Sequence, residues 1–136
     1  MDFDRMLKLS REGFQCAQIL MILALESDDE ENSGLVRAAG GLNMGFSDMS
    51  GTCGALTGGC CFISYFAGKG EADELEDPAY KEMLSKFASW FRAEYGGQIC
   101  TDILGGDAKN MIDRCPDIIQ TTYAKAIEIL EENGVI

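Results

Sequence analysis

The densest group of cysteines in the chain lies in one run of small residues, Thr52-Cys53-Gly54-Ala55-Leu56-Thr57-Gly58-Gly59-Cys60-Cys61. Three of the six cysteines of the 136-residue chain fall within it. Ser50 or Thr52 can cap a helix that starts here and runs to about residue 67, with Cys53 in its first turn. Because glycine lowers helix propensity, close packing must compensate. The run therefore predicts a buried helix that another segment can approach closely.

Apolar residues recur at three- and four-residue steps through the rest of the chain, and no segment alternates as a strand does. Cys115-Pro116 starts the last helix and Asn133-Gly134 closes it. An apolar loop at residues 43–51 is expected to cover either the core or a site. The pattern predicts an all-α, single-domain bundle of about five to six helices over residues 1–136. The other expected helices span residues 3–26, 35–42, 78–95 and 98–104.

The chain is acidic, with 23 Asp and Glu against 11 Lys and Arg and a net charge of −12. This charge disfavours nucleic acid and anionic membrane surfaces as partners. The N-terminus is acidic where a secretory signal is basic, and the apolar windows are shorter than the roughly 20 residues of a membrane helix. A cytoplasmic protein is expected, in which cysteines are reduced thiols, metal ligands or catalytic groups.

Histidine is absent from the sequence. This excludes Ser-His and Cys-His nucleophile pairs, mixed Cys/His zinc sites and a haem held by an axial histidine. Any metal must therefore be held by sulfur, carboxylate or backbone oxygen.

Cys53 and Cys115 share one expected setting, because each is predicted at the N-terminus of a helix. Unpaired backbone N–H groups and the helix dipole favour a thiolate there, and the same groups suit an iron–sulfur cluster. The alternative is that each is a cap or a small buried apolar residue.

The other cysteines give weaker signals when each is taken alone. Cys16 lies within an apolar helical stretch and, by itself, is interpreted as a core residue. Cys100 lies between two glycine pairs that allow sharp bends. Cys60 and Cys61 are adjacent, so their side chains diverge by about 100° on a helix, which favours a packing role.

Gly54 and Gly58 are four residues apart and remove side-chain bulk from one side of the predicted helix. Two interpretations remain open. The glycines allow either tight packing against another helix or room for a cofactor or substrate beside Cys53.

Four stretches of the sequence together resemble the bacterial and archaeal C_GCAxxG_C_C family of redox-active proteins. The likeness covers nearly the whole chain, and it implies redox chemistry without naming a reaction. It assigns the four family cysteine positions to Cys16, Cys53, Cys100 and Cys115, with Cys60 and Cys61 as extras. The four stretches are Phe14-Gln15-Cys16-Ala17-Gln18, Gly51-Thr52-Cys53-Gly54-Ala55-Leu56-Thr57-Gly58, Cys100 and Cys115-Pro116.

The chain departs from the family pattern at one position. The family name gives Gly-Cys-Ala, whereas this chain has Cys53-Gly54-Ala55, so its cysteine comes one residue earlier. On a helix this turns the side chain by about 100°. The family is also similar to a domain of split-Soret cytochromes, but this chain lacks the Cys-x-x-Cys-His haem attachment motif.

Three functional hypotheses follow. In the first, the four family cysteines form a redox site that binds an iron–sulfur cluster or another thiolate-held metal and serves a redox partner protein. In the second, a low-pKa Cys53 or Cys115 performs metal-free thiol–disulfide chemistry. In the third, the chain is a structural or partner-binding module with cysteines in its core, and an aromatic stripe over residues 80–95 allows a homodimer. The residues alone do not decide whether the protein is an enzyme.

Overall fold

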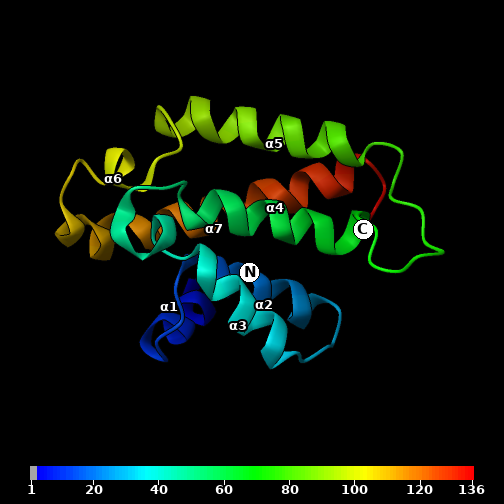
Figure 1. Cartoon of the computed structure of the whole chain (residues 1–136), viewed down its shortest axis with the longest axis horizontal. Helices are drawn as coiled ribbons and strands as arrows, with labels where there is room; N and C mark the ends of the chain where they lie inside the picture. Colours follow the sequence, from blue (N-terminus) through cyan, green and yellow to red (C-terminus); the bar gives the residue numbers. More distant parts are fainter. Residues whose placement is uncertain (1–2) are drawn as a thin grey trace.

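The computed structural model describes residues 3–136, and within that range the chain forms seven α-helices and no strand. The predicted all-α class is confirmed. The helices form a bundle in which α4 lies between α5 on one side and α2 on the other (Figure 1). The α-helices are α1 (Phe3–Arg11), α2 (Cys16–Ser27), α3 (Ser33–Ala39), α4 (Gly54–Ala67), α5 (Tyr80–Tyr95), α6 (Cys100–Ile103) and α7 (Met111–Glu132).

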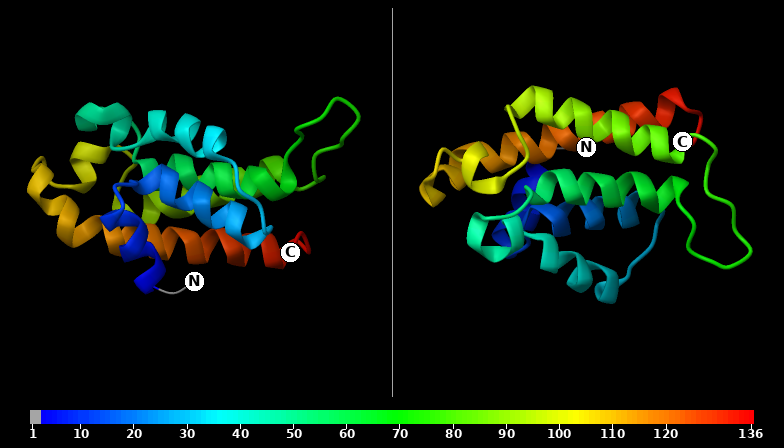
Figure 2. Two further views of the ribbon diagram at one scale, coloured as in Figure 1. Left: turned by 90° about the horizontal axis from the view of Figure 1, so that it is seen from below. Right: turned by 45° about the horizontal axis from the view of Figure 1, so that its top comes forward.

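Helix α4 is the centre of the bundle and packs against α2, α5 and α7 (Figure 2). Its glycines make this possible. A Cβ atom at Gly58 would lie 2.8 Å from the Cα atom of Ala17 in α2, and one at Gly59 would lie 2.3 Å from the ring of Phe87 in α5. The close approach expected from the small residues is therefore present, and α4 also buries Phe62 and Ile63 in the core.

The N-terminal region is two helices, so the prediction of one continuous helix over residues 3–26 was wrong. Helix α1 ends before Gly13, whose φ of +97° favours glycine. The backbone N–H of Gln15 donates to the side chain of Gln18 at 3.4 Å, and α2 starts at the next residue. Cys16 is therefore the first residue of α2 and does not lie in the middle of a helix.

The C-terminal helix α7 starts at Met111, earlier than predicted, with Pro116 inside it. A 3₁₀ turn, η3 (Ala108–Asn110), leads into the helix. Pro116 is the sixth residue of the helix, so its missing N–H removes the backbone hydrogen bond that would otherwise reach the carbonyl oxygen of Ile112. Cys115 consequently lies one turn inside α7, and its predicted place at the helix N-terminus was wrong.

Helix α5 matches its predicted range closely and ends at Gly96, whose φ is +73°. Its inner face buries Met83, Phe87 and Phe91. The connection from α4 to α5 projects from the bundle as a long loop (Figure 1), in which Leu75 is 94% exposed. No helix among residues 3–136 is long and apolar enough to cross a membrane.

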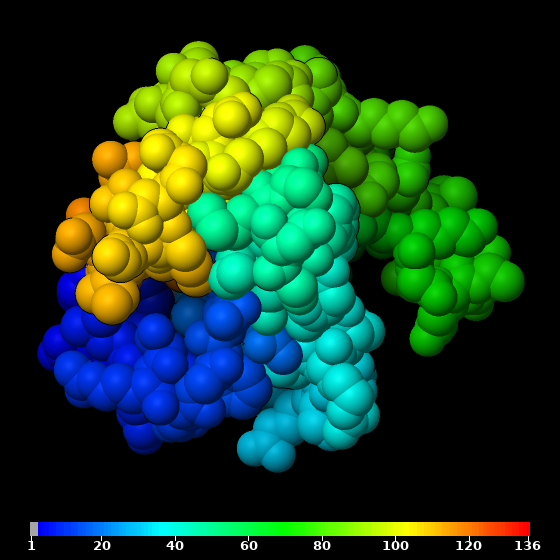
Figure 3. Space-filling view, turned by 60° about the vertical axis from the view of Figure 1, so that its left-hand side comes forward, coloured from blue at the N-terminus to red at the C-terminus, as the bar shows by residue number. Residues whose placement is uncertain are grey.

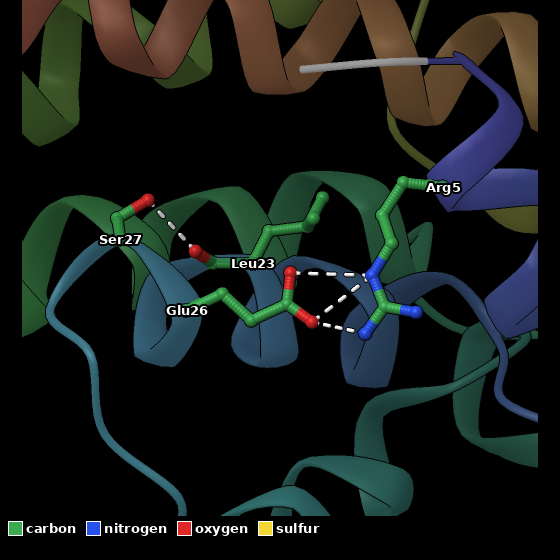
Figure 4. A network of polar contacts seen from close by, with 4 residues as sticks. All are labelled: Arg5, Leu23, Glu26 and Ser27. Atoms are coloured by element: carbon green, nitrogen blue, oxygen red, sulfur yellow. Dashed lines mark hydrogen bonds and ion pairs between the residues drawn. The ribbon is translucent and has the colours of Figure 1, made fainter.

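Helix α1 is tied to α2 by an ion pair on the surface (Figure 4). The guanidinium of Arg5 donates to the carboxylate of Glu26 through two of its nitrogens, one of them at 3.0 Å. An exposed pair of this kind contributes about 1 kcal/mol or less. Its main effect is to fix the direction in which α1 leaves the bundle.

The segment between α3 and α4 is irregular. Asn32 caps α3 by accepting from the N–H of Leu35 at 2.9 Å. A 3₁₀ turn, η1 (Gly40–Leu42), and a π-type turn, η2 (Gly45–Met49), follow. Several residues of this stretch have positive φ, so a compact turn is held beside the start of α4.

Candidate functional site

A cavity of about 370 Å³ lies at the end of the bundle where α6 sits. Four of the six cysteines line it: Cys16, Cys53, Cys100 and Cys115. They come from α2, the start of α4, α6 and α7. In Figure 3 the parts of the surface that carry α1 (blue), η2 (teal) and residues 100–112 (yellow to orange) meet around a depression. Residues spread over most of the sequence thus border one space.

A short antiparallel contact brings Cys53 and Cys100 together. Thr52 and Ile99 form an isolated β-bridge. The N–H of Cys53 donates to the carbonyl oxygen of Gln98 at 2.7 Å, and the N–H of Cys100 donates to that of Gly51 at 2.9 Å. The first turns of α4 and α6 therefore start side by side, each with a cysteine at its beginning.

The position of Cys16 depends on the buried side chain of Asn43. The Oδ1 atom of Asn43 accepts from the N–H of Ala17 at 3.1 Å, and its Nδ2 atom donates to Gln18 at 3.0 Å. This amide caps α2 from the loop before α4. Met44, the next residue, lines the cavity. The apolar loop therefore covers the site, one of the two roles that the sequence allowed.

The two glycines that the sequence linked to a cofactor have different neighbours. A Cβ atom at Gly54 would lie 2.2 Å from the Sγ atom of Cys16, so the missing side chain gives space to that sulfur. Gly54 also lines the cavity. Gly58 faces the backbone of α2 at Ala17 instead. Tight helix packing therefore accounts for Gly58.

The same geometry explains the departure from the Gly-Cys-Ala order. Cys53 is the N-cap of α4, with φ −53° and ψ 130°, so its side chain does not follow the helical direction of the next residues. It reaches the cavity from outside the helix. A side chain at position 54 would collide with Cys16. In this chain the cysteine fits at 53 and not at 54.

The four thiols all have raised pKa values. Burial is the first cause, and it raises the pKa of Cys53 to about 11 and that of Cys115 to about 12. The charge of a Cys16 thiolate contributes in the same direction at Cys53, Cys100 and Cys115. Cys16 is thus the common electrostatic neighbour of the other three.

Backbone N–H groups act in the opposite direction at two of the sulfurs. At Cys16, burial raises the pKa, while hydrogen bonds from the backbone of Met44 and Gly54 are among those that lower it. At Cys53, hydrogen bonds from the backbone of Ala55 and Leu56 lower the pKa. In the metal-free protein, burial raises the pKa of each thiol by more than these hydrogen bonds lower it. The donors nevertheless face the positions where thiolate charge would develop.

The sulfurs surround the cavity without meeting at one point. All six cysteines are free thiols. Within residues 3–136, no three Cys, Asp or Glu side chains lie close enough to hold one metal ion. Ligands of a single zinc ion, for example, all lie about 2.3 Å from it. The arrangement is therefore wider than a preformed site for one ion.

Cys60 and Cys61 lie further along α4 and do not line this cavity. Both are half-buried and pack against the hydrophobic core. Burial raises the pKa of Cys60 to about 11, and the neighbouring Cys61 adds to the increase. Their expected packing role agrees with these contacts.

Two polar residues that help to build the site were not singled out in the sequence. Asn43 gave no signal beyond its place in an apolar loop, and its role depends on α2 lying beside that loop. Gln98 acts through its backbone carbonyl, which every residue has. Neither role could be recognised without the tertiary contact.

The profile of one family, "Putative redox-active protein (C_GCAxxG_C_C)", matches residues 14–129 of the chain. Comparisons with curated proteins and with solved structures gave no match. The matched region spans most of the chain and includes all four cysteines that line the cavity. The chain therefore belongs to the C_GCAxxG_C_C family of redox-active proteins.

Proposed function

We propose that Cys16, Cys53, Cys100 and Cys115 together bind an iron–sulfur cluster, which exchanges electrons with a partner protein. The observation that carries the proposal is the convergence of four thiols, from four segments, on one largely apolar cavity. Redox activity at the level of the family agrees with it.

The donor set fits a cluster in its chemistry. Thiolate sulfur is the usual ligand of iron–sulfur clusters, and the chain has no histidine to compete. The thiolates that hold a cluster would be shared among two or four irons, so they need not all surround one ion. The wide spacing of the four sulfurs is compatible with such an arrangement. When bound, the cluster would supply one-electron transfer.

Electrostatics supports a cationic occupant. Burial raises the pKa of all four thiols, and the charge of Cys16 raises that of the other three further, so the four cannot all ionise in the metal-free protein at neutral pH. Iron supplies the positive charge that makes the ionised forms stable, and thiol protons are released when it binds. The backbone N–H groups at Cys16 and Cys53 would then donate to ligand sulfur.

The metal-free alternative has less support. A nucleophilic cysteine needs a thiolate at neutral pH, whereas burial raises the pKa of all four thiols. The rate of alkylation against pH in the metal-free protein tests this directly. An apparent pKa clearly below about 8.5 for any of the four would favour thiol chemistry instead.

The main test is reconstitution without air. The reduced protein is incubated with ferrous iron and sulfide, desalted, and assayed for iron, sulfide and visible absorption. We expect retained iron and sulfide in equal amounts, a broad visible band, and bleaching of that band by dithionite. A colourless protein with no retained iron and four freely titrating thiols would contradict the proposal.

A further inference from the structure

The cavity is lined by more than its four thiols. Helix α1 contributes Met6 and Leu7 to the lining and contains no cysteine. Helix α7 contributes Ile112 and Ile119 beside Cys115. These side chains form an apolar wall that the binding of iron does not require. The wall needs a separate explanation.

Among residues 3–136, none of those that line the cavity carries a charged side chain. Apart from the thiols, their polar side chains are those of Ser10 and Gln15. Moving an ion out of water into such a space is costly unless a partner charge is present. The net charge of −12 adds a further penalty for anions. For a molecule that does not bind through the sulfurs, the lining therefore selects an uncharged one.

The volume of about 370 Å³ lies at the lower end of the range for small-molecule pockets, about 300 to 1,000 Å³. Ile112, which also lines the cavity, is 83% exposed, so it stands where the cavity meets solvent. Figure 3 shows a depression between the surfaces of α1, η2 and residues 100–112. A small molecule could enter from solvent without crossing the core.

We infer that this cavity binds a small, uncharged, apolar molecule next to the four thiols. Its role as a substrate of the redox site rests on the proposed function, but its binding does not. Bound there, such a molecule would lie beside the sulfurs, within reach of the redox site.

The test uses the metal-free, reduced protein labelled with ¹³C in its methionine methyl groups. Toluene is the probe, and benzoate is a charged control of similar size. Met6, Met44 and Met111 line the cavity, whereas Met21 and Met83 are buried elsewhere in the core. We expect toluene to shift the signals of the first three saturably and to leave the other two unchanged, while benzoate shifts none.

A matched pair of variants locates the binding. Leu7→Trp fills the cavity, whereas Leu84→Trp adds the same bulk on α5, away from it. We expect the first to weaken toluene binding by about tenfold or more and the second to leave it unchanged. The inference is overturned by the absence of saturable shifts, by equal shifts of Met21 and Met83, by equal binding of benzoate, or by unaltered binding in Leu7→Trp.

This test can fail separately from the iron test. Iron binding without toluene binding would leave the proposed function in place and overturn only this inference. Toluene binding to a protein that retains no iron would overturn the proposed function and leave this inference in place.

Discussion

The start and the middle of helix α4 carry cysteines in different surroundings. At its start, Cys53 borders a cavity together with three cysteines that are distant in sequence. About two turns later, Cys60 and Cys61 pack against the hydrophobic core, and the partner that acts on the pKa of Cys60 is its own neighbour. Burial raises the thiol pKa at both places, so it does not distinguish them. The difference lies in which other segments pack beside each place.

This comparison shows that a cysteine gains a possible function from its tertiary neighbours more than from its own position on a helix. Cys53, Cys60 and Cys61 belong to one run of small residues, and two of them are adjacent. Of these three, only Cys53 shares a cavity with cysteines from α2, α6 and α7. The predictions that follow test this contrast.

The largest expected difference is in iron binding. Cys16→Ser should lose nearly all the iron that the reconstituted protein retains, because Cys16 is the sulfur that influences all three others. Cys60→Ser should retain iron as the unaltered protein does. Iron content and visible absorption measure both variants, with circular dichroism as the control for folding. Equal iron in the two variants would remove the contrast between the cavity cysteines and those in the middle of α4.

The next effect concerns the space beside Cys16. Gly54→Ala places a Cβ atom 2.2 Å from the Cys16 sulfur and 2.9 Å from the carbonyl oxygen of Leu42. We expect the free energy of unfolding to fall by about 1–3 kcal/mol or more. Gly41→Ala is the matched control, because no atom lies within 4 Å of its added Cβ, and it should change stability by less than about 1 kcal/mol. Urea denaturation of both variants measures this free energy. A loss of stability in Gly41→Ala as large as in Gly54→Ala would contradict the predicted collision.

The stability of the metal-free protein should depend on alkaline pH. Below pH 9 the thiols are neutral in both states, so the contribution of their burial is fully present. Above that pH they ionise in the unfolded chain, while Cys53 and Cys60 stay protonated until their folded pKa values of about 11. Unfolding is then favoured by about 1.4 kcal/mol per pH unit for each such thiol.

Denaturation curves between pH 8 and 11 measure this slope. Cys53→Ala and Cys60→Ala should each reduce this slope by a similar amount, because burial is the first cause of the raised pKa at both positions. A reduction in only one variant would show that the two positions differ in burial as well as in partners.

The smallest effect concerns the cap of α2. Asn43→Ala should cost about 1–2 kcal/mol of stability, because a buried amide that holds the start of α2 is lost. Asn32→Ala removes an exposed cap of α3 and should cost about 0.5–1 kcal/mol. Thermal unfolding compares the two. Asn43→Ala should also weaken iron binding, whereas Asn32→Ala should not; equal effects would mean that the loop does not position Cys16.

The fold class followed from the sequence because helical periodicity is a local property. The bounds of α5 were close to those predicted, since Gly96 marks its end. The break at Gly13 had a local signal, but the long apolar pattern on both sides concealed it. The start of α7 was misplaced because Cys115-Pro116 imitates a helix start, whereas the preceding 3₁₀ turn begins the helix earlier.

The candidate site was predictable only in part. The resemblance of the four stretches to the family assigned the four cysteines, and the same four line one cavity. Their local settings were assigned less well. Cys16 and Cys100 start helices, Cys53 caps one, and Cys115 lies inside one. Helix starts depend on caps such as Asn43, which is distant in sequence from the helix that it caps.

The sequence by itself determined the helical class and the small-residue face of α4, because both depend on residue type and local spacing, and its resemblance to the family singled out the four cysteines. The tertiary structure alone decided which sulfurs share a space, what Gly54 and Gly58 accommodate, and that an apolar wall faces the thiols. These features arise from contacts between segments far apart in the chain, and no local pattern encodes such contacts. They are fixed only when α2, α6 and α7 pack around the start of α4.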